Sequence, residues 1–186
     1  MANFEDSWWQ HFVPECYFDT VLLNKLLQTN KRLMHRKGCN NVVRDLDERL
    51  KVSFAVALID KDKNDLDYLL RCKIIYDDNK IILWKHQERQ QFVIQLNPPL
   101  EKWVIEIFEE NGLLIEDFGY SKDYKKLKKQ IKIDIDKEGD ERLNKLVNAI
   151  IKTDCASIQK IKSFFHYFKE KNYKVDIKEL NKWLTK

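Results

Sequence analysis

The sequence lacks the features that mark several common classes of protein. It has no apolar run near the ~18 residues that a membrane-spanning helix needs, and no G-x-x-x-x-G-K or G-x-G-x-x-G loop. Its first residues, MANFEDSWWQHF, are acidic and aromatic, whereas a signal peptide begins with basic and then aliphatic residues. We therefore expect a cytoplasmic protein with no membrane partner, which neither hydrolyses nucleotides through a P-loop nor binds a dinucleotide.

Cysteine, glycine and proline are also scarce. The four cysteines are Cys16, Cys39, Cys72 and Cys155. They form no C-x-x-C pair and have no histidine at ligand spacing, so neither a zinc site nor a disulfide framework is indicated. We expect four reduced and mostly buried thiols. The 4 glycines and 3 prolines fit a compact body without long linkers.

Charge is unevenly distributed along the chain. The net charge is +4, but 18 of the 34 Lys and Arg residues and only 10 of the 30 Asp and Glu residues lie in residues 119–186. We expect an α/β domain at 1–118 and a basic helical extension at 119–186. A basic part beside an acidic one is typical of proteins that hold a polyanion near a metal-binding acidic cluster. The alternative is a lysine-rich helical surface that only faces water.

Strand and helix patterns alternate in the first third of the chain. Apolar and β-branched runs predict strands at 8–13, 31–38 and 53–60, and helical spacing predicts helices at 16–27 and 40–50. Asn40 or Asn41 is expected to cap the second helix. This order predicts a small parallel sheet with right-handed crossovers, whose ligands gather at the carboxyl ends of the strands.

The rest of the chain predicts more strands and then helices only. A hairpin is expected at 71–86 around Asp77-Asp78-Asn79, followed by a strand at 89–96 and a helix at 100–112. Four further helices are expected at 121–131, 141–152, 157–171 and 177–185, with N-caps at Asp140, Asp154 and Asp176. The predicted fold class is therefore α/β: a small, mainly parallel sheet flanked by helices, with a C-terminal helical extension.

Aromatic residues are concentrated in FFHYF, residues 164–168, and in the pair Trp8-Trp9. They could serve as stacking platforms for bases or as a contact surface for another protein. Burial in the core is the favoured interpretation, because helix-spaced aromatic side chains bury well. The aromatic run covers more than one face of its helix, so another element must cover it.

Carboxylates follow two of the predicted parallel strands. Glu15 lies just after the first predicted strand, and Asp19 follows one helical turn later. Asp60 and Asp62 lie where the chain leaves the third predicted strand. If these strands are neighbours, the acids converge at one edge of the sheet. Packed carboxylates repel one another unless a cation lies among them, and oxygen ligands suit Mg²⁺ or Mn²⁺. The alternative for each pair alone is a helix cap or a turn.

These motifs resemble those of the Toprim domain, the topoisomerase-primase fold, over residues 8 to 110. Its members carry a Glu after the first strand and a D-x-D after the third, which VPECYFD and ALIDKDK match, and NPPLEKWVIE is similar to a P-x-x-E-x-W-L stretch of small stand-alone members. Cys16 differs from the family, which usually has Gly there, and Trp103 aligns with a packing residue. The resemblance places five residues on the family's acids: Glu15, Asp19, Asp60, Asp62 and Glu101.

The resemblance implies a nuclease, a hydrolase that cuts the phosphodiester bonds of DNA or RNA with Mg²⁺ (or Mn²⁺). Asp60 and Asp62 would hold the ion, Glu15 would be a ligand or a proton-transfer group, Asp19 would assist and Glu101 would complete a second site. Such an ion polarises phosphate and activates water. Three further residues on the hairpin and just after it could contact phosphate or simply be exposed: Lys85, His86 and Arg89.

The resemblance also suggests partners. Stand-alone members of the overcoming-lysogenization-defect type often act in bacterial antiviral defence beside an ATPase, so an ATPase partner, a second copy of this chain and nucleic acid are all expected candidates. The rival hypothesis is a catalytically silent Toprim-fold subunit that only binds a larger partner. A primase-like or ligase-like nucleotidyl transferase is less favoured, because no nucleotide pocket can be identified in the sequence.

Overall fold

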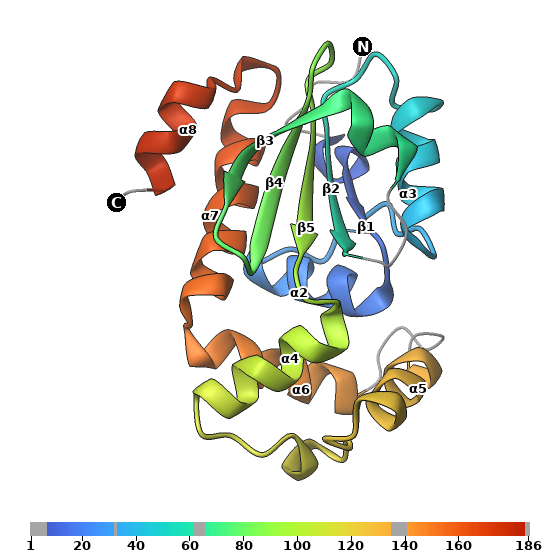
Figure 1. Cartoon of the computed structure of the whole chain (residues 1–186), viewed down its shortest axis with the longest axis vertical. Helices are drawn as coiled ribbons and strands as arrows, with labels where there is room; N and C mark the ends of the chain where they lie inside the picture. Colours follow the sequence, from blue (N-terminus) through green and yellow to red (C-terminus); the bar gives the residue numbers. More distant parts are fainter. Residues whose placement is uncertain (1–6, 32, 62–65, 135–140, 185–186) are drawn as a thin grey trace.

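The structure is a computed structural model of the chain that describes residues 7–31, 33–61, 66–134 and 141–184 (Figure 1). Its centre is a five-stranded sheet with the order β1-β2-β5-β4-β3. The strands are β1 (Phe12–Pro14), β2 (Ala55–Asp60), β3 (Cys72–Asp77), β4 (Ile81–His86) and β5 (Gln91–Leu96). The neighbours β1, β2 and β5 are parallel, whereas β4 and β3 are antiparallel to their neighbours. The predicted α/β class and the hairpin are confirmed.

Helices surround this sheet and form the C-terminal part of the chain (Figure 1). They are α2 (Tyr17–Leu26), α3 (Cys39–Asp47), α4 (Leu100–Glu110), α5 (Tyr124–Asp134), α6 (Glu141–Thr153), α7 (Ala156–Lys171) and α8 (Ile177–Leu184). Short 3-10 helices occur at Trp8–His11, Asp67–Arg71, Ile115–Phe118 and Asn172–Lys174. None of the helices in the described ranges is long and apolar enough to cross a bilayer.

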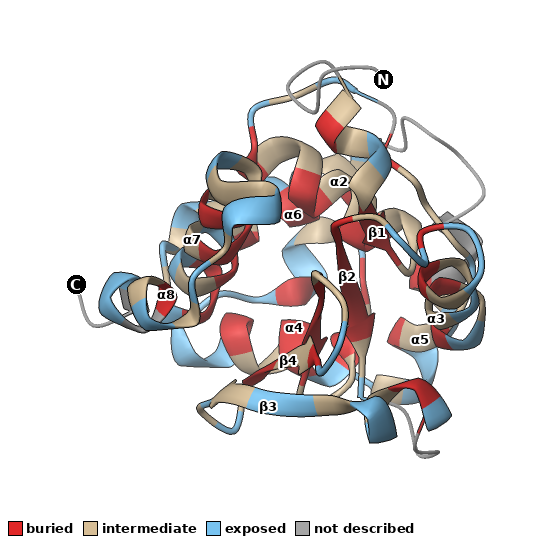
Figure 2. Cartoon of the chain, turned by 90° about the horizontal axis from the view of Figure 1, so that it is seen from above, coloured by how far each residue is buried: buried red, intermediate tan, exposed pale blue. Residues whose placement is uncertain are grey.

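Strand β2 is buried on both faces, as its continuous apolar run predicts (Figure 2). Val56 and Leu58 point into one hydrophobic cluster, which includes side chains of α2, α4, α6 and α7. Ala57 and Ile59 point into the other cluster, with side chains of α3. Because successive side chains of a strand alternate between faces, this one strand anchors helices on both sides of the sheet. The edge strand β3 is largely exposed on its outer side (Figure 2).

The aromatic run of α7 belongs to the core, which confirms the favoured interpretation of that run. Phe165 packs edge-on against Phe12 of β1 at 5.2 Å between ring centroids, and Phe168 lies 4.5 Å from Phe92 of β5. The outer side of α7 is covered by α8, whose Trp183 lies 5.5 Å from Tyr167. Residues on both sides of position 118 therefore contribute to one hydrophobic cluster.

Two predicted strands are wrong in whole or in part. Residues 8–11 form a 3-10 helix, so the first strand is only Phe12–Pro14. The described part of 31–38 is not a regular strand, although Met34 and Arg36 donate backbone hydrogen bonds to the carbonyls of Phe12 and Pro14. A regular parallel ladder would need a hydrogen bond back from the N–H of residue 14, and proline has none. This segment therefore runs beside β1 without forming a full ladder.

The predicted helix starts are right in one case and wrong in two. Asp176 caps α8, since its Oδ1 accepts a hydrogen bond from the N–H of Lys178 at 2.7 Å. Asp154 has φ +52° and is not the N-cap of α7, which is Cys155. Helix α3 is preceded by Gly38 instead of Asn40 or Asn41, and Gly38 has φ +91°, a conformation that favours glycine. The predicted cap at Asp140 lies outside the described residues.

Candidate functional site

Four acidic side chains come together at the carboxyl ends of the three parallel strands. Glu15 directly follows β1, Asp19 lies in the first turn of α2, and Asp60 is the last residue of β2. Strand β5 leads through two prolines into α4, which carries Glu101 in its first turn. Because parallel strands end at the same edge, the strand order brings residues that are far apart in sequence to one place. We call these four residues the carboxylate cluster.

Glu15 and Asp60 are in direct contact, as the strand pattern predicts. The N–H of Glu15 donates to the carbonyl of Leu58 at 3.0 Å, which extends the β1–β2 pairing by one residue. The Glu15 side chain then reaches Asp60: its Oε2 accepts a hydrogen bond from the Asp60 N–H at 2.9 Å. The same oxygen accepts one from the Cys39 thiol at 2.8 Å. Acids from the first and second parallel strands therefore share one edge of the sheet.

Asp19 is held in place by a capping box at the start of α2. Its Oδ2 accepts hydrogen bonds from the N–H of Cys16 at 3.2 Å and from the Cys16 thiol at 3.1 Å, while the Asp19 N–H donates to the Cys16 sulfur at 3.5 Å. Cys16 has φ −140°, which any residue adopts, so the backbone here does not need a glycine. The thiol thus takes the place of the usual hydroxyl or carboxylate cap.

The N-terminus of α4 points at the carboxylate cluster. Leu100, the first residue of α4, has its backbone N–H close enough to the Asp60 carboxylate to favour the ionised form, although burial and the neighbouring acids outweigh this effect on the pKa of Asp60. This end of the helix dipole favours negative charge and stabilises the ionised form of Asp60. Glu101, one residue later, is only 6% exposed and acts electrostatically on Asp60.

The cluster carries more buried negative charge than its surroundings neutralise. None of the ion pairs between described residues includes Asp19, Asp60 or Glu101. Burial, and then repulsion by Glu15, raises the pKa of Asp19 to about 8. Burial, and then repulsion by Asp19, Glu15 and Glu101, raises the pKa of Asp60 well above its usual range. The protein alone therefore favours protonated carboxyl groups here.

The raised pKa of Asp19 gives a testable dependence of stability on pH. In the unfolded chain Asp19 loses its proton near its ordinary pKa of 3.8, whereas the folded protein holds that proton until about pH 8. The folded state thus binds more protons between these values, so the free energy of unfolding should fall as pH rises from 4 to 8 and then level off. Urea denaturation in EDTA at several pH values measures this slope. Asp19→Asn should flatten it, and an unchanged slope in that variant would contradict the assignment.

Two cysteines belong to the site that sequence reasoning did not identify. Cys39 donates to Glu15, and burial, followed by the charge of Glu15, raises the pKa of its thiol, which stays protonated. Burial and the charges of Asp19 and Asp60 raise the pKa of Cys16 likewise. A signal existed for Cys39: it lies between the predicted strand at 31–38 and the predicted helix at 40–50. Helix starts of this kind lie at the same sheet edge as the acids.

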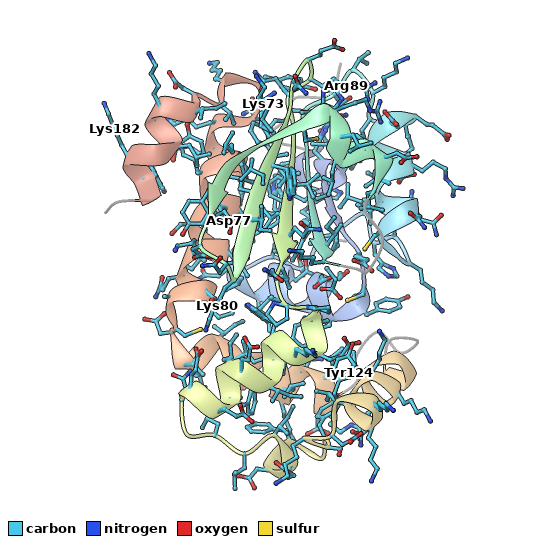
Figure 3. The ribbon with its side chains drawn as sticks, in the orientation of Figure 1. Lys73, Asp77, Lys80, Arg89, Tyr124 and Lys182 are labelled. Carbon is cyan, nitrogen blue, oxygen red and sulfur yellow. The ribbon has the colours of Figure 1, made fainter. Side chains whose placement is uncertain are left out.

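The three predicted phosphate contacts do not lie near the carboxylate cluster. Lys85 pairs with Phe92 near the start of β5, whereas Asp60 pairs with Leu96 at its end, so Lys85 and His86 lie at the opposite end of the sheet. Figure 3 shows Arg89 at that far end as well. Arg89 forms an ion pair with Asp47 at 2.8 Å, Lys85 donates to two backbone carbonyls, and His86 is buried. We therefore leave these residues out of the site.

The chemistry of the cluster fits a hard divalent cation. Asp19 Oδ1 and Asp60 Oδ1 are buried and have no hydrogen-bond partner among the described residues. Carboxylate oxygens are the ligands that Mg²⁺ and Mn²⁺ prefer. No three acidic, histidine or cysteine side chains in the described ranges form a ready coordination shell, since Glu15 is turned towards Cys39 and the Asp60 N–H. Asp62, the remaining predicted ligand, lies outside the described residues.

Comparison with known proteins gives no information about the role of the carboxylate cluster. No protein-family model matches the chain, and neither a curated protein nor a solved structure matches it significantly.

Proposed function

We propose that this protein is a Toprim-like nuclease that hydrolyses phosphodiester bonds of DNA or RNA with Mg²⁺ or Mn²⁺. One observation carries the proposal: four carboxylates meet at the ends of three parallel strands, Asp19 and Glu101 buried and Glu15 and Asp60 half-buried. Among the described residues, one oxygen of Asp19 and one of Asp60 have no hydrogen-bond partner. A chain that only needed stability would gain by placing apolar residues there, because buried unneutralised acids are costly. A divalent cation removes that cost.

The proposed roles follow from the contacts of each residue. Asp60 and Asp19 would hold the ion through the oxygens that have no partner among the described residues, and Glu15 would complete the set. Asp62 lies outside the described residues, and its role as a ligand rests on the family resemblance alone. The bound cation would polarise the phosphate and lower the pKa of an attacking water. Glu101 adds negative charge beside Asp60 and supports a second cation.

Helix α5 supports nucleic acid as the substrate. Tyr124, at its start, has the ammonium groups of Lys102 and Lys128 at 5.6 Å and 5.8 Å from its ring centroid. Lys102 follows Glu101 on α4, and Figure 3 shows Tyr124 below the carboxyl ends of the strands, on the side of the sheet where the carboxylate cluster lies. Four further lysines on or beside α5 are exposed: Lys122, Lys125, Lys126 and Lys129. An aromatic ring among lysines can stack on a base while the lysines contact phosphate.

Removing lysines from α5 should weaken nucleic-acid binding and its dependence on salt. In Lys125→Gln/Lys129→Gln, each lost phosphate contact should reduce the slope of log K against log[salt] by ~0.7 to 0.9. Fluorescence anisotropy with a labelled single strand in EDTA measures both quantities. The matched control, Lys174→Gln/Lys178→Gln, removes two exposed lysines from the other end of the helical part. Equal effects of the two pairs would mean that α5 contributes only through net charge.

The test of the proposed function combines cleavage with metal binding. Labelled single- and double-stranded DNA and RNA are incubated with the purified chain in Mg²⁺, Mn²⁺ or EDTA, and thermal stability is followed in the same buffers. The proposal requires metal-dependent cleavage of at least one substrate that Asp60→Asn abolishes. Metal-dependent stabilisation without cleavage of any substrate would refute the nuclease and leave a metal-binding protein.

A second candidate, a catalytically silent binding subunit, is favoured by a specific observation. Glu15 and Asp19 already accept hydrogen bonds from Cys39, Cys16 and the Asp60 backbone, so the folded site is partly satisfied without an ion. Such a subunit would act beside a larger partner such as an ATPase. It would show neither metal-dependent stabilisation nor cleavage, alone or with that partner.

A further inference from the structure

A cavity lies beside β1 and the first turn of α2. It has a volume of about 430 Å³ and is formed between α2, residues 30–31 and 33–36, and Arg49 after α3. None of the four acids of the carboxylate cluster lines it. The volume is within the range of small-ligand sites, ~300 to 1,000 Å³. It exists because Pro14 prevents a full ladder, so that 34–36 runs beside β1 while its side chains face α2 across a gap.

The charged residues that line the cavity are all basic. Lys31, Arg36 and Arg49 line it, and its described lining includes no Asp or Glu. A single carboxylate behind them, Asp45, is shared: its Oδ2 lies 2.5 Å from Arg36 Nε and 3.5 Å from Arg49 Nη2. Three cations against one carboxylate leave a surplus of two positive charges. A phosphomonoester carries about −1.5 to −2 at pH 7 and would balance that surplus, whereas a phosphodiester would balance only half of it.

Aromatic and amide groups line the rest of the cavity. Tyr17 and His35 face each other with ring centroids 4.3 Å apart and an interplanar angle of 31°. Each ring covers one face of the other, so a planar base can stack on the outer face of the pair, which we call the Tyr17–His35 wall. Gln10 and Asn30 also line the cavity and offer amide donors and acceptors for the edge of a base. Guanidinium groups for phosphate thus stand beside a stacking wall and amides.

We propose that this cavity binds the phosphomonoester end of a nucleotide, with Arg36, Arg49 and Lys31 on the phosphate and the Tyr17–His35 wall on the base. The ligand is either a free nucleoside monophosphate or the 5′-phosphorylated end of a strand, which present the same chemistry. The site is separate from the carboxylate cluster and does not depend on a metal ion. It would allow a nucleotide or a strand end to be recognised independently of any cleavage.

Calorimetric titration of the full chain in EDTA tests this proposal. The probes are AMP, adenosine, ribose 5-phosphate, and one short oligonucleotide with either a 5′-phosphate or a 5′-hydroxyl. AMP or the phosphorylated oligonucleotide should bind, and each analogue that lacks the phosphate or the base should bind at least tenfold more weakly. Tighter binding of the phosphorylated strand than of AMP would identify the strand end as the ligand, and the reverse would identify the free nucleotide.

Two double variants isolate the cavity from the overall charge. Lys31→Gln/Arg49→Gln removes two exposed cavity cations and should weaken binding at least tenfold. Arg44→Gln/Lys51→Gln removes two exposed cations on and after α3 that do not line the cavity, and should leave binding unchanged. The proposal fails if neither AMP nor the phosphorylated strand binds, or if ribose 5-phosphate binds as well as AMP. It also fails if AMP does not bind and the 5′-hydroxyl strand binds as well as the phosphorylated one, or if both double variants behave alike.

Discussion

Asp60→Asn is expected to abolish both the stabilisation of the protein by Mg²⁺ or Mn²⁺ and its cleavage of nucleic acid. Asp60 contributes an unpartnered buried oxygen and lies against three other acids, so it is the centre of the proposed metal site. Loss of a metal ligand should reduce cleavage by about 100-fold or more. At a metal concentration 100 times the dissociation constant, the wild type should gain ~2.7 kcal/mol in free energy of unfolding. The variant should gain none.

The same substitution should make the metal-free protein more stable above pH 3.8, the ordinary pKa of Asp, where Asp60 ionises in the unfolded chain but not in the folded protein. Asparagine keeps the size of the side chain and can still accept a hydrogen bond, but it cannot ionise among Asp19, Glu15 and Glu101. Substitution of a residue with a purely structural role would lower the stability of the metal-free protein. Substitution of Asp60 should instead raise that stability and abolish metal binding. The matched control is Asp117→Asn, which changes an exposed acid away from the cluster. If Asp60→Asn destabilised the apo protein at high pH, the repulsion argued here would be absent.

The carboxylate cluster could be predicted from sequence because it depends on strand order and direction. Each acid follows an apolar run, and parallel strands with helical crossovers must end at one edge. Glu101 was predicted as a site residue only from the family resemblance. In the structure its charge acts on Asp60. The position of Lys85 depends instead on whether β4 pairs with β5 in a parallel or an antiparallel direction. An antiparallel partner places its end beside the start of its neighbour, and the sequence pattern alone did not fix that pairing.

The cavity beside β1 and the packing of α7 were less accessible to sequence reasoning. The pattern at 31–38 resembles a strand, and only the missing N–H of Pro14 prevents a regular ladder. The aromatic run at 164–168 predicts burial but gives no partner, because long-range packing leaves no local signal. In the structure the partners are Phe12 and Phe92, which are more than 70 residues away in the chain.

Phe168→Ala should therefore destabilise the whole protein and not only its helical part. The side chain is fully buried and packs against Phe92 of β5, Phe54 and Phe164. Removing a buried phenylalanine side chain costs ~3 to 5 kcal/mol in free energy of unfolding, because the cavity that remains is only partly refilled. Urea denaturation followed by circular dichroism and tryptophan fluorescence gives the loss. Hydrogen exchange should show faster exchange of the β5 amides, since they lie under this contact.

The control is Leu114→Ala, which removes a leucine that is 63% exposed and should change the free energy of unfolding by less than ~0.5 kcal/mol. If the helices after residue 118 were a separate unit, Phe168→Ala would loosen them while β5 kept its protection, and unfolding would occur in two steps. One shared transition that shifts as a whole is the result expected from a continuous core, because Phe92 and Phe168 belong to the same cluster. The carboxylate cluster at the end of β5 would then owe its rigidity partly to α7.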